Sequence, residues 1–382
     1  MAAESSRSRI PPFHVMDVLA AANERARTHG DVLILCAGQP STPAPGPVLR
    51  ATREALDSRV LGYTETFGIR DLREAIAAHH RAVSGIEVEA DDVVVTTGSS
   101  GAFSLLFLAA FDVGDTVVVA RPGYPAYRNT LTALGCRVVE LDCGAASRFQ
   151  PTVAMLAALP QPPAGLIVAS PANPTGTVID PDELAALARW CSAHGTLLIS
   201  DEIYHGIVYA GRTASAWQTS RAAVVIGSVS KYFSMTGWRL GWMLVPSELR
   251  RPLQRLASNL TVCPPAISQY AAIAAFSAES RTELAGHVRR YAANRELLLD
   301  GLAELGITDL APADGAFYAY ADISELTRDS GAWCADILAR TGVALAPGID
   351  FDTVRGVCSV RISFAGGSAE IAEALSRLAT VL

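Results

Sequence analysis

Short runs of β-branched and other apolar residues alternate with stretches of helical periodicity between about residues 91 and 245. The runs are typical of buried strands, because they are short, rich in valine and isoleucine, and bounded by small or polar residues. The predicted strands are residues 93–97, 116–121, 136–142, 165–170, 196–202 and 223–228. Between several of them lie segments with apolar residues at helical spacing, namely residues 99–111 and 181–195. Strands alternating with helices predict an α/β fold with a largely parallel sheet covered by helices on both faces.

The pattern changes after Pro264. One helical segment runs from about 279 to 305, and strand patterns follow at 316–323, 343–348 and 358–365, before a final helix from about Ser368. We therefore expect a second, smaller α+β domain. The predicted organisation is an N-terminal segment packing on the small domain (1–47), a large domain (48–285) and a small C-terminal domain (286–382). Residues 237–245 are a further candidate strand of the large sheet, and this strand can run antiparallel to its neighbours.

Composition narrows the functional classes. The chain has 382 residues, of which 50% are hydrophobic and 18% charged, and this fits a compact α/β enzyme. A net charge of −7 without a long basic run argues against a nucleic-acid partner. No signal-type apolar segment follows the N-terminus, and the apolar stretch at 102–111 is too short to span a membrane. Seven irregularly spaced cysteines match neither a disulfide framework nor a zinc site, so we expect a cytoplasmic protein without a metal.

The segment from Ser228 to Gly241, SVSKYFSMTGWRLG, carries the most chemical information. Its Lys231 offers an amine that can hold an aldehyde cofactor, although a lysine by itself is more often a solvated surface charge. Asp201, at the end of a predicted buried strand, is suited to keep the ring nitrogen of a pyridine cofactor protonated. Considered alone, Asp201 also fits a helix N-cap or a buried ion pair.

Small and basic residues nearby are suited to a phosphate. TTGSSGAF places Ser99, Ser100 and Gly101 where a strand turns into a helix, so that backbone N–H groups and the helix dipole face an anion. Gly/Ser turns of this kind are common, and the segment is neither a Walker A loop nor a dinucleotide fingerprint. Arg239 is a candidate phosphate clamp, and Ser228 and Ser230 offer hydroxyl donors.

Four further residues are candidates for ring and substrate contacts. Asn173 and Tyr204 can donate to a phenolate oxygen on the ring, although an Asn before Pro is also typical of a turn. Tyr124 offers an aromatic face, with a place in the core as the alternative. Arg361 lies mid-strand among apolar neighbours, which is costly unless it meets an anion such as a substrate carboxylate. His205, beside Tyr204, fits a supporting or core position better than that of a catalytic base.

Nine motifs in one order resemble the class I/II aminotransferase family of fold type I pyridoxal phosphate enzymes. They are Gly38-Gln39-Pro40, GYTETFGIRDLR, TTGSSGA, PGYPAY, SPANPTGTV, SDEIYHG, SVSKYFSMTGWRLGW, GAFY and VRISF, and they cover nearly the whole chain. The resemblance implies a pyridoxal 5′-phosphate cofactor, a homodimer with shared active sites, and catalysis by Lys231, Asp201 and Tyr204. The cofactor contacts it implies are Ser99, Ser100, Gly101, Tyr124, Asn173, Asp201, Tyr204, Ser228, Ser230, Lys231, Arg239 and, from the partner subunit, Tyr63.

The same resemblance implies a substrate site of Gly38, Asn173 and Arg361, with Arg361 on the α-carboxylate, and ping-pong transfer of an amino group to an oxo acid. Aspartate-specific members carry a lysine in the phosphate loop or an arginine after the catalytic lysine. Here Ser100 and the segment NLTVCPPAIS stand at these places. We therefore expect a neutral donor such as valine or alanine with pyruvate or 2-oxoglutarate as acceptor.

Alternatives remain at this stage. An aspartate aminotransferase is the runner-up, because Arg7, Arg9 or Arg27 can still reach the site from the N-terminal segment. A C–S lyase or decarboxylase would share every cofactor residue and differ only in its products. A non-enzymatic regulator would be expected to lose Lys231 or to gain a basic segment, and the sequence shows neither change.

Overall fold

A central sheet organises the fold in the computed structural model, which describes residues 4–382. Its strand order is β2-β8-β7-β6-β5-β3-β4. The strands are β2 (Val93–Thr96), β3 (Thr116–Arg121), β4 (Arg137–Asp142), β5 (Gly165–Ala169), β6 (Leu197–Asp201), β7 (Val224–Ser228) and β8 (Gly241–Leu244). β3, β4, β5, β6 and β7 pair in parallel, whereas β8 runs antiparallel to both β7 and β2. The predicted mostly parallel α/β sheet is therefore confirmed, and so is the antiparallel option for residues 237–245.

Successive strand residues face opposite layers of helices, as the pleat of a strand requires. On β3, Val117 and Val119 belong to one buried cluster and Val118 to another. The first cluster includes side chains of α4 (Gly98–Ala110), α5 (Pro125–Ala133) and α8 (Ser247–Leu260). The second includes side chains of α2 (Gly46–Ser58), α3 (Arg70–Ser84), α6 (Val153–Ala157), α7 (Pro181–His194) and α9 (Ala266–Ala275).

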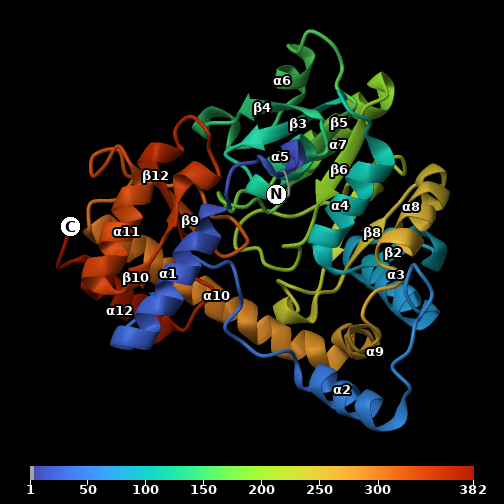
Figure 1. The fold of residues 1–382 in the computed structure, drawn as a ribbon, viewed down its shortest axis with the longest axis horizontal. Helices are drawn as coiled ribbons and strands as arrows, with labels where there is room; N and C mark the ends of the chain where they lie inside the picture. The colour runs from blue at the N-terminus through green and yellow to red at the C-terminus, as the bar shows by residue number, and fades with distance from the viewer. Residues whose placement is uncertain (1–3) are drawn as a thin grey trace.

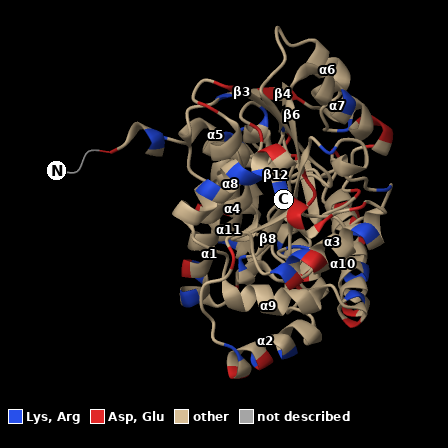
Figure 2. Ribbon diagram, turned by 90° about the vertical axis from the view of Figure 1, so that its right-hand side faces the viewer, with Lys and Arg blue, Asp and Glu red and all other residues tan. Residues whose placement is uncertain are grey.

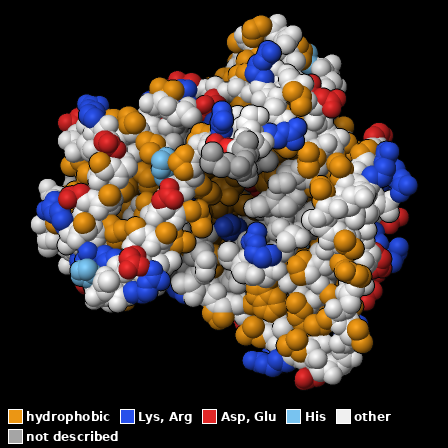
Figure 3. Space-filling view, in the orientation of Figure 1, with side chains coloured by type: hydrophobic (Ala, Val, Ile, Leu, Met, Phe, Trp, Pro, Cys, Tyr) orange, Lys and Arg blue, Asp and Glu red, His pale blue; other side chains and the backbone are white. Residues whose placement is uncertain are grey.

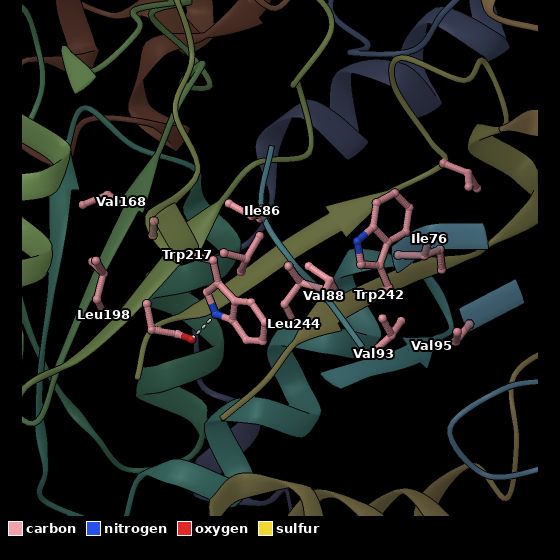
Figure 4. Close-up of a cluster of buried hydrophobic side chains, with 14 of the residues drawn as sticks. Ile76, Ile86, Val88, Val93, Val95, Val168, Leu198, Trp217, Trp242 and Leu244 are labelled. Carbon is pink, nitrogen blue, oxygen red and sulfur yellow. Dashed lines mark hydrogen bonds between the residues drawn. The ribbon is translucent and has the colours of Figure 1, made fainter. Parts of the chain in front are cut away.

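Two tryptophans fill the second cluster, shown in Figure 4. Trp242 lies on β8 near Ile76 of α3, and Trp217 lies near Ile86 and Leu244 of β8. The Trp217 indole N–H donates to the carbonyl of Ala223 at 2.7 Å, which satisfies the one polar group of this buried side chain. The face of the sheet away from α4 is thus densely packed beneath α3 and α9.

The remaining elements form a smaller antiparallel sheet, in the order β11-β12-β9, with its own helices. It contains β9 (Tyr318–Asp322), β11 (Ala346–Pro347) and β12 (Ser359–Ser363), next to α11 (Ser330–Thr341) and α12 (Ser368–Leu378). The N-terminal helix α1 (His14–His29) packs on β10, β11 and α11, and β1 (Leu33–Ile34) pairs in parallel with β10 (Val343–Ala344). The first and last parts of the chain therefore lie together, at the left of Figure 1.

Helix α10 (Ala278–Glu304) runs between the two sheets. Near its start Leu284 belongs to the large-sheet cluster, whereas Tyr291 and Leu298 belong to the small-sheet cluster. Lys, Arg, Asp and Glu residues are scattered along the helices in the ribbon of Figure 2. Within residues 4–382, no helix is long and apolar enough to cross a membrane.

Candidate active site

The carboxyl ends of β5, β6 and β7 lie side by side and carry several of the predicted site residues, including Asn173, Asp201 and Lys231. In a parallel sheet this edge is where ligands bind, because adjacent strands deliver their following loops to one place. A cavity of about 580 Å³ opens there, and α1, α4 and α5 close its sides. Figure 3 shows this face of the molecule hollowed between the small-sheet elements and the large sheet. Its lining includes Gly38, Ser99, Ser100, Tyr124, Asn173, Asp201, Tyr204, Ser230, Lys231, Arg239 and Arg361.

Lys231 follows β7 in an irregular segment and extends its amine into this cavity. Its Nζ donates to the carbonyl of Gly38 at 2.7 Å and lies 5.8 Å from the centre of the Tyr204 ring. Burial, followed by the charges of Arg361 and Arg239, lowers the pKa of Lys231 from its usual 10.5 to about 8. Near neutral pH the neutral, nucleophilic amine is therefore a substantial minority form, as a catalytic lysine requires.

Lys231 is also the one lysine in the chain. The sequence has 31 lysine and arginine residues in total, and all the others are arginines. A charged surface needs no lysine when arginine serves instead, whereas imine chemistry requires a primary amine. This count is a signal in the sequence that singles out Lys231 without any motif.

Asp201 ends β6 and is buried, with 3% of its surface exposed. Its Oδ2 accepts a short hydrogen bond from the Tyr127 hydroxyl, and its Oδ1 accepts from the backbone N–H of Ile203 at 3.2 Å. Burial raises the pKa of Asp201 to about 6, and these two hydrogen bonds oppose that rise. The carboxylate is held on the cavity floor without an arginine or lysine in ion-pair contact among residues 4–382.

Arg361, in the middle of β12, is the buried cation that the sequence predicts to need an anion. Its Nη1 donates to Oδ1 of Asn173 at 2.9 Å and its Nη2 to the carbonyl of Cys36 at 2.5 Å, while the buried Nε has no partner. The guanidinium lies over the rings of Tyr318 and Phe351, at 4.4 and 4.6 Å from their centres. No carboxylate within residues 4–382 forms an ion pair with Arg361, so its charge is free for a ligand.

Ser99, Ser100 and Arg239 meet at the start of α4. Gly98 there has φ +71°, and a Cβ on it would lie 2.5 Å from Nη2 of Arg239, so only glycine lets the arginine approach the helix end this closely. Free backbone N–H groups, two hydroxyls and a guanidinium converge in this part of the cavity. This donor set matches a phosphate group.

Three predicted cofactor contacts lie outside the cavity lining. Gly101 is inside α4, and the Ser228 hydroxyl donates to the carbonyl of Leu240 at 3.3 Å and lines a second cavity behind the site. Tyr63 is 88% exposed, away from this chain's own site. Their predicted cofactor contacts therefore remain predictions.

Sequence reasoning missed two tyrosines in motifs that it had noted. Tyr318, in GAFY, shares a 2.7 Å hydrogen bond with the Tyr204 hydroxyl, and a side chain at Gly38 would overlap its hydroxyl group. Tyr127, in PGYPAY, is the hydrogen-bond donor to Asp201. Their place in the site depends on which face of β9 or α5 meets the cavity, and the motifs alone do not show this.

An apolar wall from the N-terminal segment was missed as well. Phe13, Val15, Met16 and Leu19 line the cavity opposite the polar groups. The Phe13 ring meets the Tyr124 ring edge-on, with 5.9 Å between the ring centres. Two backbone N–H groups at the start of α1 donate to the carboxylate of Asp350, which holds this wall over the site.

Comparison with known proteins agrees with this geometry. The family described as aminotransferase class I and II matches residues 30–378. The chain belongs to the class I and II aminotransferase family. Among curated aminotransferases, it is 60% identical to the valine–pyruvate aminotransferase of Mycobacterium tuberculosis over 98% of this chain and 97% of that protein. It is 34% identical to the aspartate/prephenate aminotransferase of Thermus thermophilus, over 97% and 96%.

Solved aminotransferase structures show the same fold. An aminotransferase from Mycobacterium tuberculosis superposes with a TM-score of 0.97 at 59% identity, covering 100% of this chain and 99% of that one. The Thermus thermophilus aspartate aminotransferase with maleate gives 0.95 at 33% identity, with full coverage of both chains. The fold predicted from the sequence, the family and the aminotransferase activity are thus confirmed.

Proposed function

We propose that this aminotransferase uses pyridoxal 5′-phosphate to move the amino group of a neutral L-amino acid, such as valine or alanine, to pyruvate or 2-oxoglutarate. The observation that carries the proposal is the composition of the cavity. It presents one buried arginine without an anionic partner, and an apolar wall stands where a second cation would be needed for a dicarboxylic substrate. The relative at 60% identity bears the name valine–pyruvate aminotransferase, which supports the same substrate class.

The residues fit the cofactor. Lys231 supplies the amine, Asp201 a buried carboxylate for the ring nitrogen, and Tyr124 an aromatic face. Ser99, Ser100 and Arg239 would hold the phosphate, while Asn173 and Tyr204 would donate to the ring oxygen. A cationic ring nitrogen beside Asp201 would favour the ionised carboxylate over the neutral acid that burial promotes.

When bound, the cofactor supplies an electron sink for the bonds at the substrate Cα. Arg361 holds the α-carboxylate through N–H groups that no other carboxylate occupies. The Lys231 amine accepts the proton from the substrate Cα and later returns a proton, and its lowered pKa suits both roles. Tyr318 and Gly38 keep Tyr204 and Lys231 in place through hydrogen bonds, and α1 restricts the access of water.

The side chain of the substrate would meet Phe13, Val15, Met16 and Leu19. Among the described lining residues, the cations are Lys231, Arg239 and Arg361, each of which already has a role. Arg7 and Arg9 are exposed outside the cavity, and Arg27 pairs with Glu24 on the surface of α1. A distal carboxylate would therefore be buried without a partner, which costs several kcal/mol, roughly 2–7 for even a neutral polar group.

A homodimer is part of the proposal. Leu56, Val60 and Leu61 are exposed on and after α2, and Leu260 and Val262 at the end of α8. Figure 3 shows apolar side chains gathered over α2 and α9 on this face. A second copy covering this surface would shield the apolar groups and bring the exposed Tyr63 to the partner's phosphate site, as the resemblance to the family implies.

The predicted division at residues 47 and 285 is also a proposal. The change of buried cluster along α10, between Leu284 and Tyr291, supports the second boundary. The packing of α1 on β10, β11 and α11 supports assigning the N-terminal segment to the small domain, although residues 1–3 lie outside the described part of the chain.

The test follows the visible absorbance of the holoenzyme as single amino acids are added without an oxo acid. We expect valine and alanine to convert the bound cofactor to its aminated form, and aspartate to do so far more slowly. A response to aspartate alone would overturn the substrate proposal in favour of the runner-up, an aspartate aminotransferase. The Thermus thermophilus relative at 34% identity bears the name aspartate/prephenate aminotransferase. A bound cofactor that no amino acid converts would instead favour a lyase or decarboxylase.

A further inference from the structure

A second cavity, of about 660 Å³, lies behind the active site. Part of its wall comes from two segments that also line the active site, through neighbouring residues, and the rest comes from α3 and other segments. Asp201, Tyr204 and Lys231 line the active-site cavity, whereas Glu202, His205 and Tyr232 line the rear one. Ile203, between Glu202 and Tyr204 in the sequence, lines both cavities. This volume is within the usual range for small-molecule sites.

Glu202 is the unusual group in the rear cavity, with 5% of its surface exposed. Its Oε1 accepts from the Ser200 hydroxyl at 3.0 Å and from the backbone N–H of Ala216 at 2.9 Å. Its Oε2 is buried and has no hydrogen-bond partner. The nearest basic atom, Nδ1 of His205, lies 3.5 Å from Oε2 without a hydrogen bond to it, and the His205 Nε2 is likewise buried without a partner.

Two buried polar atoms on one cavity wall are costly unless a ligand satisfies them. His205 does not neutralise Glu202 internally, because burial lowers the pKa of His205 to about 4. His80 cannot turn to Glu202 without loss, because its Nε2 accepts from the indole N–H of Trp242 at 3.0 Å. Within residues 4–382 no three His, Cys, Asp or Glu side chains are placed to hold a metal ion, so an organic donor is the better match for Oε2.

The outer part of the cavity has the opposite charge. Arg212 and Arg281 contribute to the lining, and neither forms an ion pair with any carboxylate of residues 4–382. Arg281 donates to the carbonyl of Phe276 at 2.6 Å, which fixes its guanidinium near the cavity. Between the two ends the wall is largely apolar and aromatic, with Val225, Tyr232, Phe233 and Trp242. A ligand that matches this arrangement has an ammonium group, an apolar body and a carboxylate.

We propose that the rear cavity is a second binding site for a small zwitterionic aminocarboxylate, whose ammonium group donates to Oε2 of Glu202 and whose carboxylate pairs with Arg281. A purely cationic ligand would meet two unpaired arginines, and a purely anionic one would meet Glu202. The site is separate from the one that binds the amino-acid substrate, because Arg361 and Lys231 are absent from its lining.

The experiment uses holoenzyme reduced with borohydride, so that the cofactor is fixed to Lys231 and added amines cannot react there. A mass increase on the chain's one lysine confirms the trapping first, so a failure to bind cofactor is seen separately. The probes are 4-aminobutanoate, 6-aminohexanoate and 4-(aminomethyl)benzoate, titrated by calorimetry in the presence of a saturating monocarboxylate that occupies Arg361.

We expect one probe to bind saturably to the wild type, and Glu202→Gln to weaken that binding about tenfold or more, because a charge-assisted hydrogen bond is replaced by a misplaced donor. Glu202→Gln keeps an oxygen for Ser200 and Ala216 and is expected to fold. We expect Arg281→Met, at the exposed start of α10, to weaken binding of the same probe by a similar factor. The matched controls are Glu74→Gln on α3 and Arg289→Met on α10, which are exposed and outside the cavity lining.

Absence of binding by all three probes, or binding that both cavity variants leave unchanged, overturns the proposal. A crystal structure of the reduced enzyme soaked with the tightest probe gives an independent result. Density for the probe between Glu202 and Arg281 supports the site, and ordered water alone in the cavity overturns it.

Discussion

Arg361 is a buried cation and Lys231 a partly buried one, and neither has a carboxylate in ion-pair contact within residues 4–382. Such groups destabilise a fold unless a ligand meets them, so their presence together in the lining of one cavity is a property of a site rather than of a core. Arg361 keeps its charge in place through Asn173, a carbonyl and two aromatic rings. Lys231 instead responds to burial by a change in its pKa.

Replacement of Arg361 by glutamine tests the carboxylate contact. We expect the KM for valine to rise about tenfold or more, because a charge-assisted hydrogen bond contributes roughly 1.5–3 kcal/mol. Steady-state kinetics measure the change. The control is Arg340→Gln, at an exposed i,i+4 ion pair on α11, which should leave KM unaltered. Equal KM values in wild type and Arg361→Gln would remove Arg361 from the substrate site.

Replacement of Lys231 by alanine removes the proposed base. We expect kcat to fall by a factor of about 10²–10⁴ or more, because a positioned acid–base group contributes that much on its own. The variant should also show no cofactor attached after borohydride reduction, as measured by intact-protein mass. Retention of a covalently attached cofactor would contradict the assignment of Lys231.

The lowered pKa of Lys231 predicts a dependence of stability on pH in the cofactor-free protein. Between about pH 8 and 10.5 the unfolded amine is protonated and the folded amine is not, so unfolding takes up a proton and stability rises with pH across this window. Below pH 8 the full cost of burying the charge is present. Urea unfolding should therefore give Lys231→Met a higher free energy of unfolding than wild type at pH 7. This difference should become smaller as the pH rises toward 10.5. A stability difference between Lys231→Met and wild type that does not change with pH would contradict the lowered pKa of Lys231.

At the scale of secondary-structure elements, α1 depends on one distant side chain. The Asp350 carboxylate accepts from the backbone N–H groups of His14 and Val15 at 2.9 and 2.7 Å, where the helix itself provides no side-chain cap. These contacts satisfy two of the N–H groups that the first turn of any helix leaves unpaired. The start of α1 also carries the apolar wall of the cavity, so the position of this wall depends on the contacts of Asp350 with the helix.

Asp350→Ala tests this connection. We expect a loss of about 0.5–2 kcal/mol in the stability of α1, the usual cost of removing a helix cap. Hydrogen exchange should accelerate in residues 14–20 while the strands of the large sheet keep their protection. Asp336→Ala, at an exposed position of α11, is the control. Uniform acceleration over the whole chain would show that Asp350 supports the fold in general rather than α1.

Strands of the large sheet were predictable because burial on both faces leaves a plain sequence pattern. The expected run 116–121 matches β3 fully, and 165–170 differs from β5 by one residue. The predicted helix 279–305 corresponds to α10, shifted by one residue at each end. The pairing of Leu33 with Val343 had no comparable signal, since two-residue strands form only where tertiary packing brings their chains together.

The candidate site was predictable where chemistry restricts the residue type. An amine, a buried carboxylate and a buried arginine have few substitutes, so Lys231, Asp201 and Arg361 were identified and lie in one cavity. Tyr127 and the α1 wall were not identified, because apolar and aromatic residues have many uses and only the fold decides which face they present. Ser228 shows the same limit, since its position relative to two cavities depends on a local turn.

At the scale of the whole molecule, the proposed dimer makes its own prediction. Val60 is 93% exposed beside Tyr63, and Val60→Asp would place a charge in the proposed interface. We expect the variant to dissociate at concentrations where the wild type is dimeric, by analytical ultracentrifugation, and to lose cofactor affinity with it. Val113→Asp, on a loop after α4 and 74% exposed, is the matched control. A dimeric, fully active Val60→Asp enzyme would place the interface elsewhere.

The link between α1 and Asp350 joins residues more than 330 positions apart in the chain. During synthesis, α1 leaves the ribosome more than 300 residues before β10, β11 and Asp350. The docking surface of α1 is therefore incomplete until residues 343–350 have emerged, whereas all strands of the large sheet emerge earlier. A chain that terminates before residue 343 can pair its large sheet but lacks the Asp350 carboxylate and the β10 and β11 surfaces that hold α1. Such products should be recognised by chaperones and proteases through an exposed N-terminal helix, long after most of the protein has formed.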